Sequence, residues 1–405
     1  MCTTAAITGK QSYGEQGAEV VISAGEASGD WVGARLGEAL RGRQPGLRLT
    51  GIGGPRMAAA GVELFTDSSA WGAIGVWEAA VKAPGVWQAL RAARRRLAER
   101  PPAGLVLIDC GAFNLPLARQ ARRLGVRSLY YFPPGSWSRR LRSPELGEVA
   151  DVVATPFPWS RDLLRGGRAR VEWVGHPVVE AARPQLRPEE AAARYGINTA
   201  RPTIALAPGS RQQEMRYVLP VLAQAAGLLC ERFPGLQVVV PVAPTVSKEA
   251  VGRALRAAAV QPVLLEGMDY DGLQLAQAAA VCSGTATLEF ACLGVPMVVV
   301  YRASRATTLQ YRLMRGLLGG QRLAAMPNIL AGREVVPELL GSAARPAAVA
   351  EAVGRLLADP ARREEVRAGL KEAATALGPP GASARTAELV LELIGTGEAA
   401  RVAAG

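Results

Sequence analysis

Three loops rich in small residues, each placed directly after an apolar run, have the composition of phosphate-binding loops. They span residues 23–30, 207–211 and 282–289. Each precedes a helical pattern, and a loop of small residues at a helix start directs backbone N–H groups toward an anion. Arg211 adds a guanidinium that can hold a phosphate through two parallel hydrogen bonds. Such loops also serve ordinary strand–helix packing, but three of them in one chain favour an anionic ligand.

Side chains within these loops predict helix caps and a ribose contact. Gly209 allows close approach of the backbone, and Ser210 can cap the helix that follows it. Ser283 and Thr285 are expected to cap the third helix, whose first amides could receive a diphosphate. Glu289, one turn further on, can accept hydrogen bonds from both hydroxyls of a ribose. The first loop does not match the dinucleotide fingerprint, so a dinucleotide is not expected.

Two residues can act as the base in a proton transfer. Asp109 ends an apolar run, where a predicted strand reaches the edge of its sheet. His176 is the only histidine in the chain and stands before a proline. Asp109 could equally cap a helix and His176 could serve structure alone, so the sequence does not choose between them. A single histidine excludes a conventional histidine-based zinc site.

The remaining acidic and thiol side chains do not predict a metal site. Asp269 and Asp271 form a D-x-D pattern, but they precede a helical run, where helix capping is the expected role. The five cysteines lack the close spacing of metal ligands, and several lie in apolar runs, which is typical of reduced thiols in a reducing compartment. We therefore expect neither a metal nor a cofactor.

Short β-branched runs alternate with longer helical patterns along the chain, which predicts parallel βαβ units and an α/β fold. The 405 residues are too many for one ordinary domain. The expected helices span residues 31–42, 116–124, 219–232 and 285–293. The expected strands span residues 19–23, 47–52, 104–109, 128–132, 151–154, 170–174, 203–207, 237–241, 262–265, 279–282 and 297–301.

This order of elements predicts two Rossmann-like, doubly wound domains that face each other across a cleft, where the carboxyl ends of both sheets converge. The seam is a proline-containing, charged stretch near residues 179–200. The predicted divisions are a poorly ordered N-terminus over 1–18, a first domain over 19–180, a second domain over 181–341, and C-terminal helices over 342–405 that pack across both domains.

A series of sequence blocks, found in the same order, resembles the lipid-A-disaccharide synthase family. The blocks cover residues 24–30, 54–57, 108–114, 175–177, 208–211, 283–289 and 327–334. The resemblance extends roughly from Val20 to Leu340, and the last block, P-N-I-L-A-G-R-E, is long and distinctive. It implies a GT-B glycosyltransferase that joins UDP-2,3-diacylglucosamine to 2,3-diacylglucosamine 1-phosphate and releases UDP with inversion at the anomeric carbon.

The resemblance also implies a task for each site residue. Asp109, or alternatively His176, would take the proton from the 6-hydroxyl of the acceptor while Arg211 stabilises the departing diphosphate. The uracil edge would meet the backbone of Gly267 and Met268. The full UDP-binding set would be Gly209, Ser210, Arg211, Gly267, Met268, Ser283, Gly284, Thr285, Ala286, Glu289 and Asn328. The acceptor side would include Glu26, Ser28, Gly29, Asp30 and Asn114.

Two blocks depart from the family pattern on the expected acceptor side. The family motif I-D-A-P-D-F-N reads I-D-C-G-A-F-N here, so Ala112 replaces its second acidic residue. The motif S-P-x-x-W-A-W reads P-P-G-S-W-S-R over residues 133–139, which removes the second tryptophan. These changes leave the UDP half intact and leave the identity of the acyl-sugar acceptor open.

Aromatic and basic residues that follow residue 70 predict contact with a membrane surface, because apolar bulk beside cationic side chains suits an anionic bilayer. Residues of this kind also occur in ordinary cores. The sequence has no signal peptide and no apolar run long enough to span a bilayer, so we expect a cytoplasmic protein, peripheral on the inner face of the cytoplasmic membrane. The expected membrane face comprises Trp71, Trp77, Trp87, Arg94, Arg95 and Arg96.

The net charge of +12 invites anionic partners, but no zinc-finger spacing or RNP-type motif accompanies it, so nucleic acid is not expected. Three other functions stay open. The first is a GT-B glycosyltransferase that acts on another lipid-linked sugar. The second is a UDP-sugar 2-epimerase, which would need further acid–base residues in the cleft. The third is a nucleotide-sugar binder without turnover. The oligomeric state also stays open, a homodimer included.

Overall fold

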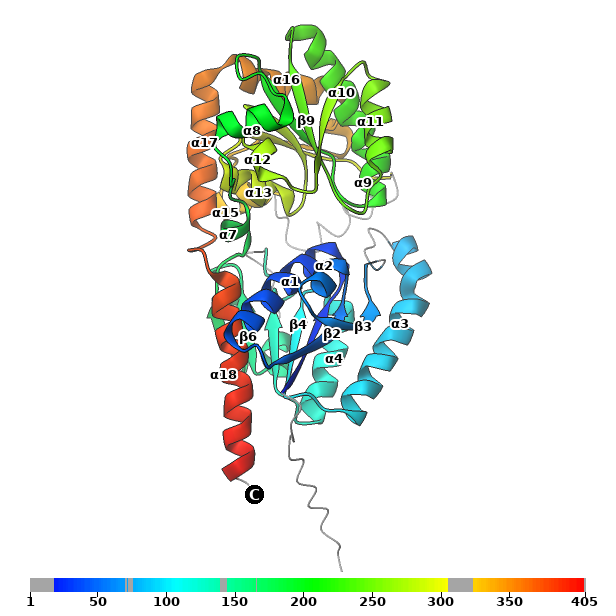
Figure 1. Ribbon diagram of the computed structural model, residues 1–405, viewed down its shortest axis with the longest axis vertical. Helices are drawn as coiled ribbons and strands as arrows, with labels where there is room; N and C mark the ends of the chain where they lie inside the picture. The colour runs from blue at the N-terminus through cyan, green and yellow to red at the C-terminus, as the bar shows by residue number, and fades with distance from the viewer. Residues whose placement is uncertain are drawn as a thin grey trace, which may run out of the picture.

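The computed structural model describes residues 18–69, 71, 76–138, 144–164, 166–304 and 323–403, which form two lobes, each built around one β-sheet (Figure 1). The first sheet has the strand order β3 (Glu63–Asp67), β2 (Arg48–Gly53), β1 (Glu19–Ala24), β4 (Gly104–Ile108), β5 (Ser128–Tyr131), β6 (Val152–Thr155) and β7 (Arg170–Trp173). The second has the order β10 (Pro262–Glu266), β9 (Gln237–Val242), β8 (Thr203–Ala207), β11 (Ala278–Cys282), β12 (Met297–Tyr301) and β13 (Glu338–Leu340).

All described strand pairs are parallel. Parallel sheets are covered by helices on both faces, which explains why β4, β8 and β11 are buried along their whole length and read as continuous apolar runs. The strand order of each sheet reverses once, between β1 and β4 and between β8 and β11. The expected α/β fold with two Rossmann-like halves is confirmed.

Helices connect the strands within each lobe. In the first lobe they are α1 (Glu26–Arg43), α2 (Pro55–Ala59), α3 (Val76–Glu99), α4 (Gly111–Arg123), α5 (Pro144–Val149) and α6 (Ser160–Leu163). The passage to the second lobe contains α7 (Val178–Ala181) and α8 (Pro188–Tyr195). The second lobe contains α9 (Gln212–Tyr217), α10 (Leu219–Arg232), α11 (Lys248–Arg256), α12 (Tyr270–Leu273), α13 (Ala286–Leu293) and α15 (Met326–Ala331).

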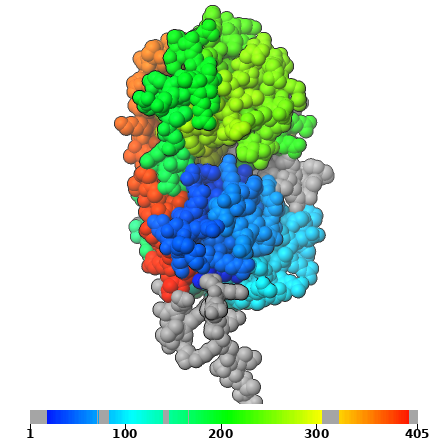
Figure 2. Space-filling view, viewed as in Figure 1, coloured from blue at the N-terminus to red at the C-terminus, as the bar shows by residue number. Residues whose placement is uncertain are grey.

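The C-terminal helices cover both lobes. After a short 3-10 turn (Gly341–Ala343), α16 (Pro346–Ala358) and α17 (Pro360–Thr375) pack on the second lobe. The chain then crosses back to the first lobe, where α18 (Ala382–Ala403) packs against α1 and against strands β4, β5 and β6 of the first sheet. Figure 2 shows these C-terminal segments running down one side of the stacked lobes. An apolar cluster that includes Phe157, Leu288 and Leu377 joins the lobes beside this crossing.

Every strand expected from the sequence is present, and its ends differ from the expected ends by at most one residue. The edge strands β3 and β13 were missed. Side chains of β3 are alternately half-buried and exposed, and β13 has only three residues, so neither gives a continuous apolar run. The expected start of α1 was also wrong, because the helix begins at Glu26 and takes in most of the first small-residue loop.

Candidate active site

The two lobes meet at the loops that follow their strand-order reversals. Glu26 begins α1 directly after β1, and Arg211 stands between β8 and α9. Arg211 Nη2 lies 3.0 Å from Glu26 Oε2, so an ion pair joins the first lobe to the second. Ligands of doubly wound sheets bind outside the carboxyl ends of the strands, at the point where the order reverses. This ion pair therefore marks the cleft in which a ligand is expected.

Asp109 lies at the same junction of the lobes, immediately after β4, where the charges of Glu26 and Arg211 both act on it. Its backbone is left-handed, with φ of 46°, and its carbonyl oxygen accepts hydrogen bonds from Asn114 Nδ2 at 2.9 Å and Tyr130 Oη at 2.7 Å. Asp109 is exposed to solvent, although the chain around it desolvates its carboxyl in part. This desolvation and the charge of Glu26 raise the pKa of Asp109 to about 6, although a backbone hydrogen bond from Cys110 and the charge of Arg211 act in the opposite direction.

Strained backbone is concentrated around Asp109. Five described residues other than glycine have positive φ, and four of them follow strands of the first sheet: Glu26, Asp109, Cys110 and Phe132. A left-handed conformation is unfavourable for such residues and persists only where the surrounding packing enforces it. The packing therefore holds Glu26 and Asp109 at the edge of the sheet in conformations that they would not adopt alone.

Arg211 is held by a second carboxylate, which the sequence analysis did not identify. Glu214 in α9 is almost completely buried, and its Oε1 lies 3.0 Å from Arg211 Nη1. The other oxygen of Glu214 accepts the backbone N–H groups of Ser210 and Arg211, at 2.7 and 3.0 Å. Gly209, with φ of 110°, leaves the space that the Glu214 side chain occupies. One sequence signal could have identified Glu214: it is an acidic residue three positions after Arg211, the cap of α9, which is the spacing of a capping box.

The loop before α13 presents uncapped amides. The expected caps from Ser283 and Thr285 were wrong, because in the described part of the chain no side chain caps this helix, and Thr287 Oγ1 instead donates to the carbonyl of Gly284 at 2.8 Å. Ser210 is likewise not a cap, since α9 has Arg211 at that position. Gly284 and Thr285 are exposed and Ala286 is half-buried. The positive end of the α13 dipole is therefore open to an anion.

Glu289 lies one turn into α13 and has a partner that the sequence analysis missed. Tyr270 Oη donates a hydrogen bond of 2.7 Å to Glu289 Oε1. Burial raises the pKa of Glu289, while the Tyr270 hydrogen bond and the positive charge of Arg56 act in the opposite direction. Arg56 belongs to α2 of the first lobe, so Glu289 lies near the junction of the two lobes. Tyr270 fixes the orientation of this carboxylate.

Four other expected site residues use their polar atoms within the fold. Asp30 accepts the N–H groups of Gly54, Arg56 and Met57, and it thereby holds the start of α2. Asn114 bonds Ser23 Oγ through its oxygen and the carbonyls of Ser23, Ile108 and Asp109 through its nitrogen. Asn328 pairs with the backbone of Val335 and Val336 and with Glu338. The N–H of Gly267 donates to Val242 at 2.8 Å.

The other three expected residues have weaker ties to the cleft. Ser28 is half-buried in the first turn of α1, and Gly29 lies against Ala24. Met268 is half-buried and packs against the core of the second lobe. The polar atoms of Asp30, Asn114 and Asn328, described above, bond to the chain itself. These residues therefore hold the loops of the site in place and do not offer those atoms to a ligand.

His176 is enclosed at the connection between the lobes. Its backbone N–H donates to the Leu377 carbonyl at 3.0 Å, and its side-chain Nδ1 accepts the N–H of Val178 at 3.1 Å. The ring lies edge-on to Phe132, with centroids 5.0 Å apart. Burial lowers the pKa of His176 to about 3. The imidazole is therefore neutral at ordinary pH, and one of its nitrogens is already engaged.

Both carboxylates of the D-x-D pattern have structural partners. Asp269 caps α12 by accepting the N–H of Gly272 at 3.1 Å, and it also accepts a hydrogen bond from Tyr195. Asp271 accepts the N–H groups of Gln185 and Leu186 in the passage between the lobes. The expected capping role is confirmed for Asp269. Among the described residues, no cluster of histidine, cysteine and acidic side chains has the arrangement of a metal site.

The expected membrane face divides into packed and exposed residues. Trp71 packs on Phe113, with ring centroids 4.7 Å apart. Arg96 forms an ion pair with Glu19 at 2.7 Å and lies over the ring of Phe65, so it is not free to meet a lipid. The Trp77 side chain lies outside the described residues.

Trp87 is the exposed aromatic residue of this region. Its side chain is 61% exposed, and the Arg91 guanidinium lies 5.8 Å from its ring centroid. Both residues belong to α3, the helix at the outer edge of the first lobe (Figure 1). Arg94 and Arg95 are also exposed, although Arg94 donates to the Pro116 carbonyl and Arg95 pairs with Glu99. Within the described residues, no helix is long and apolar enough to cross a membrane.

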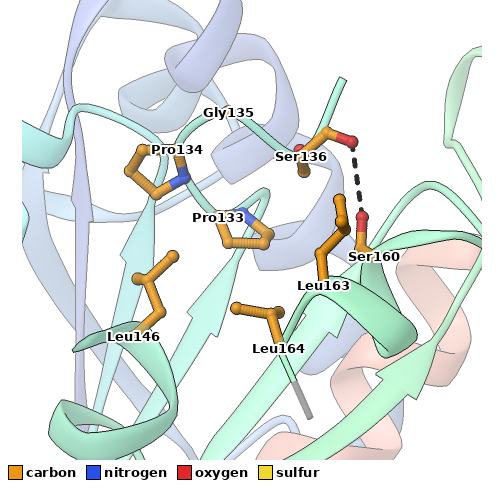
Figure 3. Close-up of a pocket in the computed structure, with 8 residues that line it drawn as sticks. All are labelled: Pro133, Pro134, Gly135, Ser136, Leu146, Ser160, Leu163 and Leu164. Carbon is orange, nitrogen blue, oxygen red and sulfur yellow. Dashed lines mark hydrogen bonds between the residues drawn. The ribbon is translucent and has the colours of Figure 1, made fainter. Parts of the chain in front are cut away.

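A small apolar pocket lies beside the block that departs from the family motif (Figure 3). Leu146 and Leu164 form one side of it, and Ser160 Oγ closes another by donating to the Ser136 carbonyl at 3.3 Å. Pro134 separates this pocket from Gly111 at the start of α4, because a Cβ on Gly111 would lie 2.8 Å from the proline ring. The altered block therefore packs against the chain just after Asp109, through the contact of Pro134 with Gly111. The pocket is lined by Pro133, Pro134, Gly135, Ser136, Leu146, Ser160, Leu163 and Leu164.

The sequence matches one protein family over nearly its whole length. A family model described as lipid-A-disaccharide synthetase matches residues 20–391. The chain is 40% identical over 382 residues to the lipid-A-disaccharide synthase of Myxococcus xanthus, which covers 93% of this chain and 98% of the relative. It is 38% identical over 378 residues to the enzyme of the same name from Geobacter metallireducens, which covers 93% and 97%.

Solved structures share the fold at low sequence identity. The UDP-GlcNAc 2-epimerase of Neisseria meningitidis, solved with UDP-GlcNAc bound, has a TM-score of 0.62 and 12% identity over 92% of this chain and 100% of that chain. MurG of Acinetobacter baumannii has a TM-score of 0.55 and 15% identity over 92% and 99%. At such identities the likeness shows the two-lobed architecture alone, and it does not favour epimerase activity.

Proposed function

Because the chain belongs to the lipid-A-disaccharide synthase family, we propose that it transfers 2,3-diacylglucosamine from UDP to 2,3-diacylglucosamine 1-phosphate, with release of UDP. The enzyme is a glycosyltransferase. One observation carries the proposal: Asp109 and Glu26 of the first lobe lie near Arg211 of the second. A candidate base, Asp109, and a candidate phosphate-binding cation, Arg211, therefore belong to the same site.

The second lobe binds the UDP of the donor. The uncapped amides at the start of α13 and the guanidinium of Arg211 provide positive charge for the diphosphate. Glu289, oriented by Tyr270, accepts hydrogen bonds from the hydroxyls of the ribose. In the UDP-bound state, Gly284 allows the diphosphate to approach the backbone because it has no side chain.

Asp109 acts as the general base. Its carboxylate takes the proton of the acceptor's 6-hydroxyl, and the oxygen attacks the anomeric carbon of the donor. A new carbon–oxygen bond forms as the bond to the diphosphate oxygen breaks, which inverts the anomeric centre, and UDP leaves with the bonding electron pair. Arg211 and the α13 amides stabilise the negative charge that develops on the leaving group. A pKa of about 6 keeps Asp109 ionised near neutral pH and basic enough to accept a proton.

We assign His176 a structural task instead. A buried imidazole whose pKa is lowered to about 3 is a weak base, and its Nδ1 already accepts a hydrogen bond from Val178. Its ring packs edge-on against Phe132 of the first lobe, and its Nδ1 bond with Val178 holds the start of the passage to the second lobe. His176 therefore holds the connection between the lobes.

Trp87 and Arg91 form the part of α3 that contacts lipid. The exposed indole and the adjacent guanidinium suit the interface of an anionic bilayer, and the diacylated substrates of this reaction reside in such a bilayer. Contact with the inner face of the cytoplasmic membrane would bring the cleft near its substrates. The acceptor specificity is then set in the first lobe, where Ala112 occupies an exposed position on the first turn of α4.

The test is an acceptor-dependent assay of UDP release with the purified protein, UDP-2,3-diacylglucosamine and 2,3-diacylglucosamine 1-phosphate, in the presence of EDTA. Release of UDP that requires the acceptor supports the disaccharide synthase reaction, and persistence in EDTA supports a reaction without a metal. UDP binding without turnover would contradict the assigned acceptor, and the same assay with other lipid-linked sugars would then identify the correct one. Absence of UDP binding would contradict the donor site as well.

A further inference from the structure

Arg211 is held between two carboxylates that differ in how firmly they are fixed. Glu214 is almost completely buried, and two backbone N–H groups hold one of its oxygens. Glu26 belongs to the other lobe, is about one-third exposed, and within the described residues its carboxylate contacts only Arg211. Nη1 of Arg211 faces Glu214 and Nη2 faces Glu26. A ligand can therefore displace Glu26 from Nη2 while Glu214 keeps the guanidinium in place.

A diphosphate in the proposed donor site requires this displacement. The guanidinium binds a phosphate best through two nitrogens in its plane. In the described structure both terminal nitrogens are already engaged by carboxylates. The contact that a diphosphate can replace at low cost is the partly exposed one with Glu26, because ion pairs that are open to solvent stabilise a structure only weakly.

Displacement of Glu26 changes the surroundings of Asp109. The groups that act on Asp109 are Glu26 from α1, which favours its protonated form, and Arg211 and the N–H of Cys110, which favour its ionised form. Tyr130 from β5 contacts only the carbonyl of Asp109. Once Nη2 of Arg211 binds the diphosphate in place of Glu26, the charge of Glu26 acts on Asp109 without its compensating cation.

We propose that Glu26 is a positioning residue with two states. In the donor-free enzyme it holds Arg211 across the cleft. When the diphosphate of the donor displaces it, Glu26 remains beside Asp109 and strengthens that carboxylate as a proton acceptor. The proposal rests on the roles assigned above to Arg211 and Asp109. It adds that the donor prepares the base before the acceptor reacts.

The first test is calorimetric titration of UDP into the full-length protein and its variants. Glu26→Gln keeps the shape of the side chain but removes its charge. UDP then no longer has to break the ion pair between Glu26 and Arg211, so its affinity should rise by about threefold, which corresponds to the strength of a partly exposed ion pair. Glu388→Gln is the matched control, because Glu388 pairs with Arg43 at the opposite end of α1. It should leave UDP affinity unchanged. Unchanged or weaker UDP binding by Glu26→Gln would overturn the proposal.

A double-mutant cycle separates displacement from simple repulsion between Glu26 and the phosphates. If Glu26 acts by holding Arg211, then Glu26→Gln should tighten UDP binding only where Arg211 is present. An equal gain in the Arg211→Ala background would show that Glu26 only repels the ligand, and it would overturn the proposal. If the wild-type protein does not bind UDP at all, the proposed donor site fails instead, so the two failures are distinguishable.

The second test is the pH dependence of turnover at saturating donor. Asp109 must be ionised to accept a proton, so turnover rises with pH through its pKa. Glu26→Gln removes a neighbouring negative charge, and the acid limb should therefore move to lower pH, while in Glu388→Gln it should stay in place. A purely structural role of Glu26 would lower turnover at every pH and leave the limb where it is. That result would contradict the proposal.

Discussion

Gly25 and Cys110 are in contact across the point where the strand order of the first sheet reverses. A Cβ built on Gly25 would lie 2.6 Å from Cys110 Sγ and 2.9 Å from Cys110 Cβ. The φ of Gly25 is −103°, a value that any residue adopts, so the glycine is needed for space and not for its backbone conformation. The contact joins the residue before Glu26 to the residue after Asp109.

Substitution Gly25→Ala should therefore displace the loop that carries Asp109. Overpacking of this kind costs about 1–3 kcal/mol of folding free energy, and a shift of the base also lowers kcat. Thermal unfolding and the UDP-release assay would measure both effects. Gly42→Ala, near the end of α1, is the control, because a Cβ there would meet no other part of the chain within 4 Å. Equal behaviour of the two variants would contradict the steric account.

The base assignment predicts a selective loss of turnover. Asp109→Asn should lower kcat by about 10²–10⁴-fold, because a general base of this kind contributes that much, while UDP affinity is retained. In the wild type, kcat/KM should rise with pH through a value near 6, because kcat/KM reports the free enzyme, where Asp109 must be ionised and its pKa is raised to about 6. An Asn variant with turnover close to the wild type would remove Asp109 from the mechanism.

His176→Asn should leave the acid limb of the pH–rate profile in place and should lower stability. Asn can still accept the N–H of Val178, but it loses the ring contact with Phe132. The pKa of His176 is about 3 when folded and about 6.5 when unfolded, so the unfolded state binds an extra proton between these values.

Wild-type stability should accordingly fall as pH drops below about 6.5, and by more than that of the Asn variant, with a difference that approaches about 1.4 kcal/mol per pH unit. Chemical denaturation at several pH values would measure it. An acid limb that disappears in His176→Asn would instead identify His176 as the base.

Tyr270→Phe should weaken donor binding without a large change in kcat. The variant removes the hydrogen bond that orients Glu289, and a lost bond to a charged group corresponds to about a tenfold rise in KM for the donor. Tyr195→Phe is a useful control, because Tyr195 donates to Asp269, which caps α12 and has no assigned contact with UDP. A rise in KM of the same size in both variants would indicate a general loss of packing.

Replacement of Trp87 and Arg91 by Ala should reduce sedimentation with vesicles that contain anionic lipid. The indole is 61% exposed, and Arg91 is its cationic neighbour. Arg95→Ala is the control, because the ion pair with Glu99 already offsets the charge of Arg95. If the double variant binds vesicles as the wild type does, α3 is not the lipid-binding element. High salt should weaken wild-type binding, since surface charge contributes to it.

Much of the fold could be predicted because parallel strands are buried on both faces. Their apolar runs made the positions of β4, β8 and β11 readable to within one residue. The edge strands β3 and β13 carried no such signal, because an edge strand is partly exposed or short. The caps expected from Ser210, Ser283 and Thr285 were wrong for another reason: a hydroxyl near a helix start can also point away from the helix amides, and the sequence does not show which way it points.

The sequence by itself determined the fold class, the loops that follow each buried strand, and the blocks that identify the family. Each of these features depends on a short stretch of neighbouring residues, and the order of neighbouring residues can be read directly from the sequence. Only the tertiary structure decided which polar residues remain free for a ligand. It engaged Asn114, Asp30 and Asn328 in backbone hydrogen bonds, buried His176, and brought Glu26 to Arg211 across 185 positions of sequence. Such pairings depend on how the two lobes pack, and burial and long-range charge have no local signature.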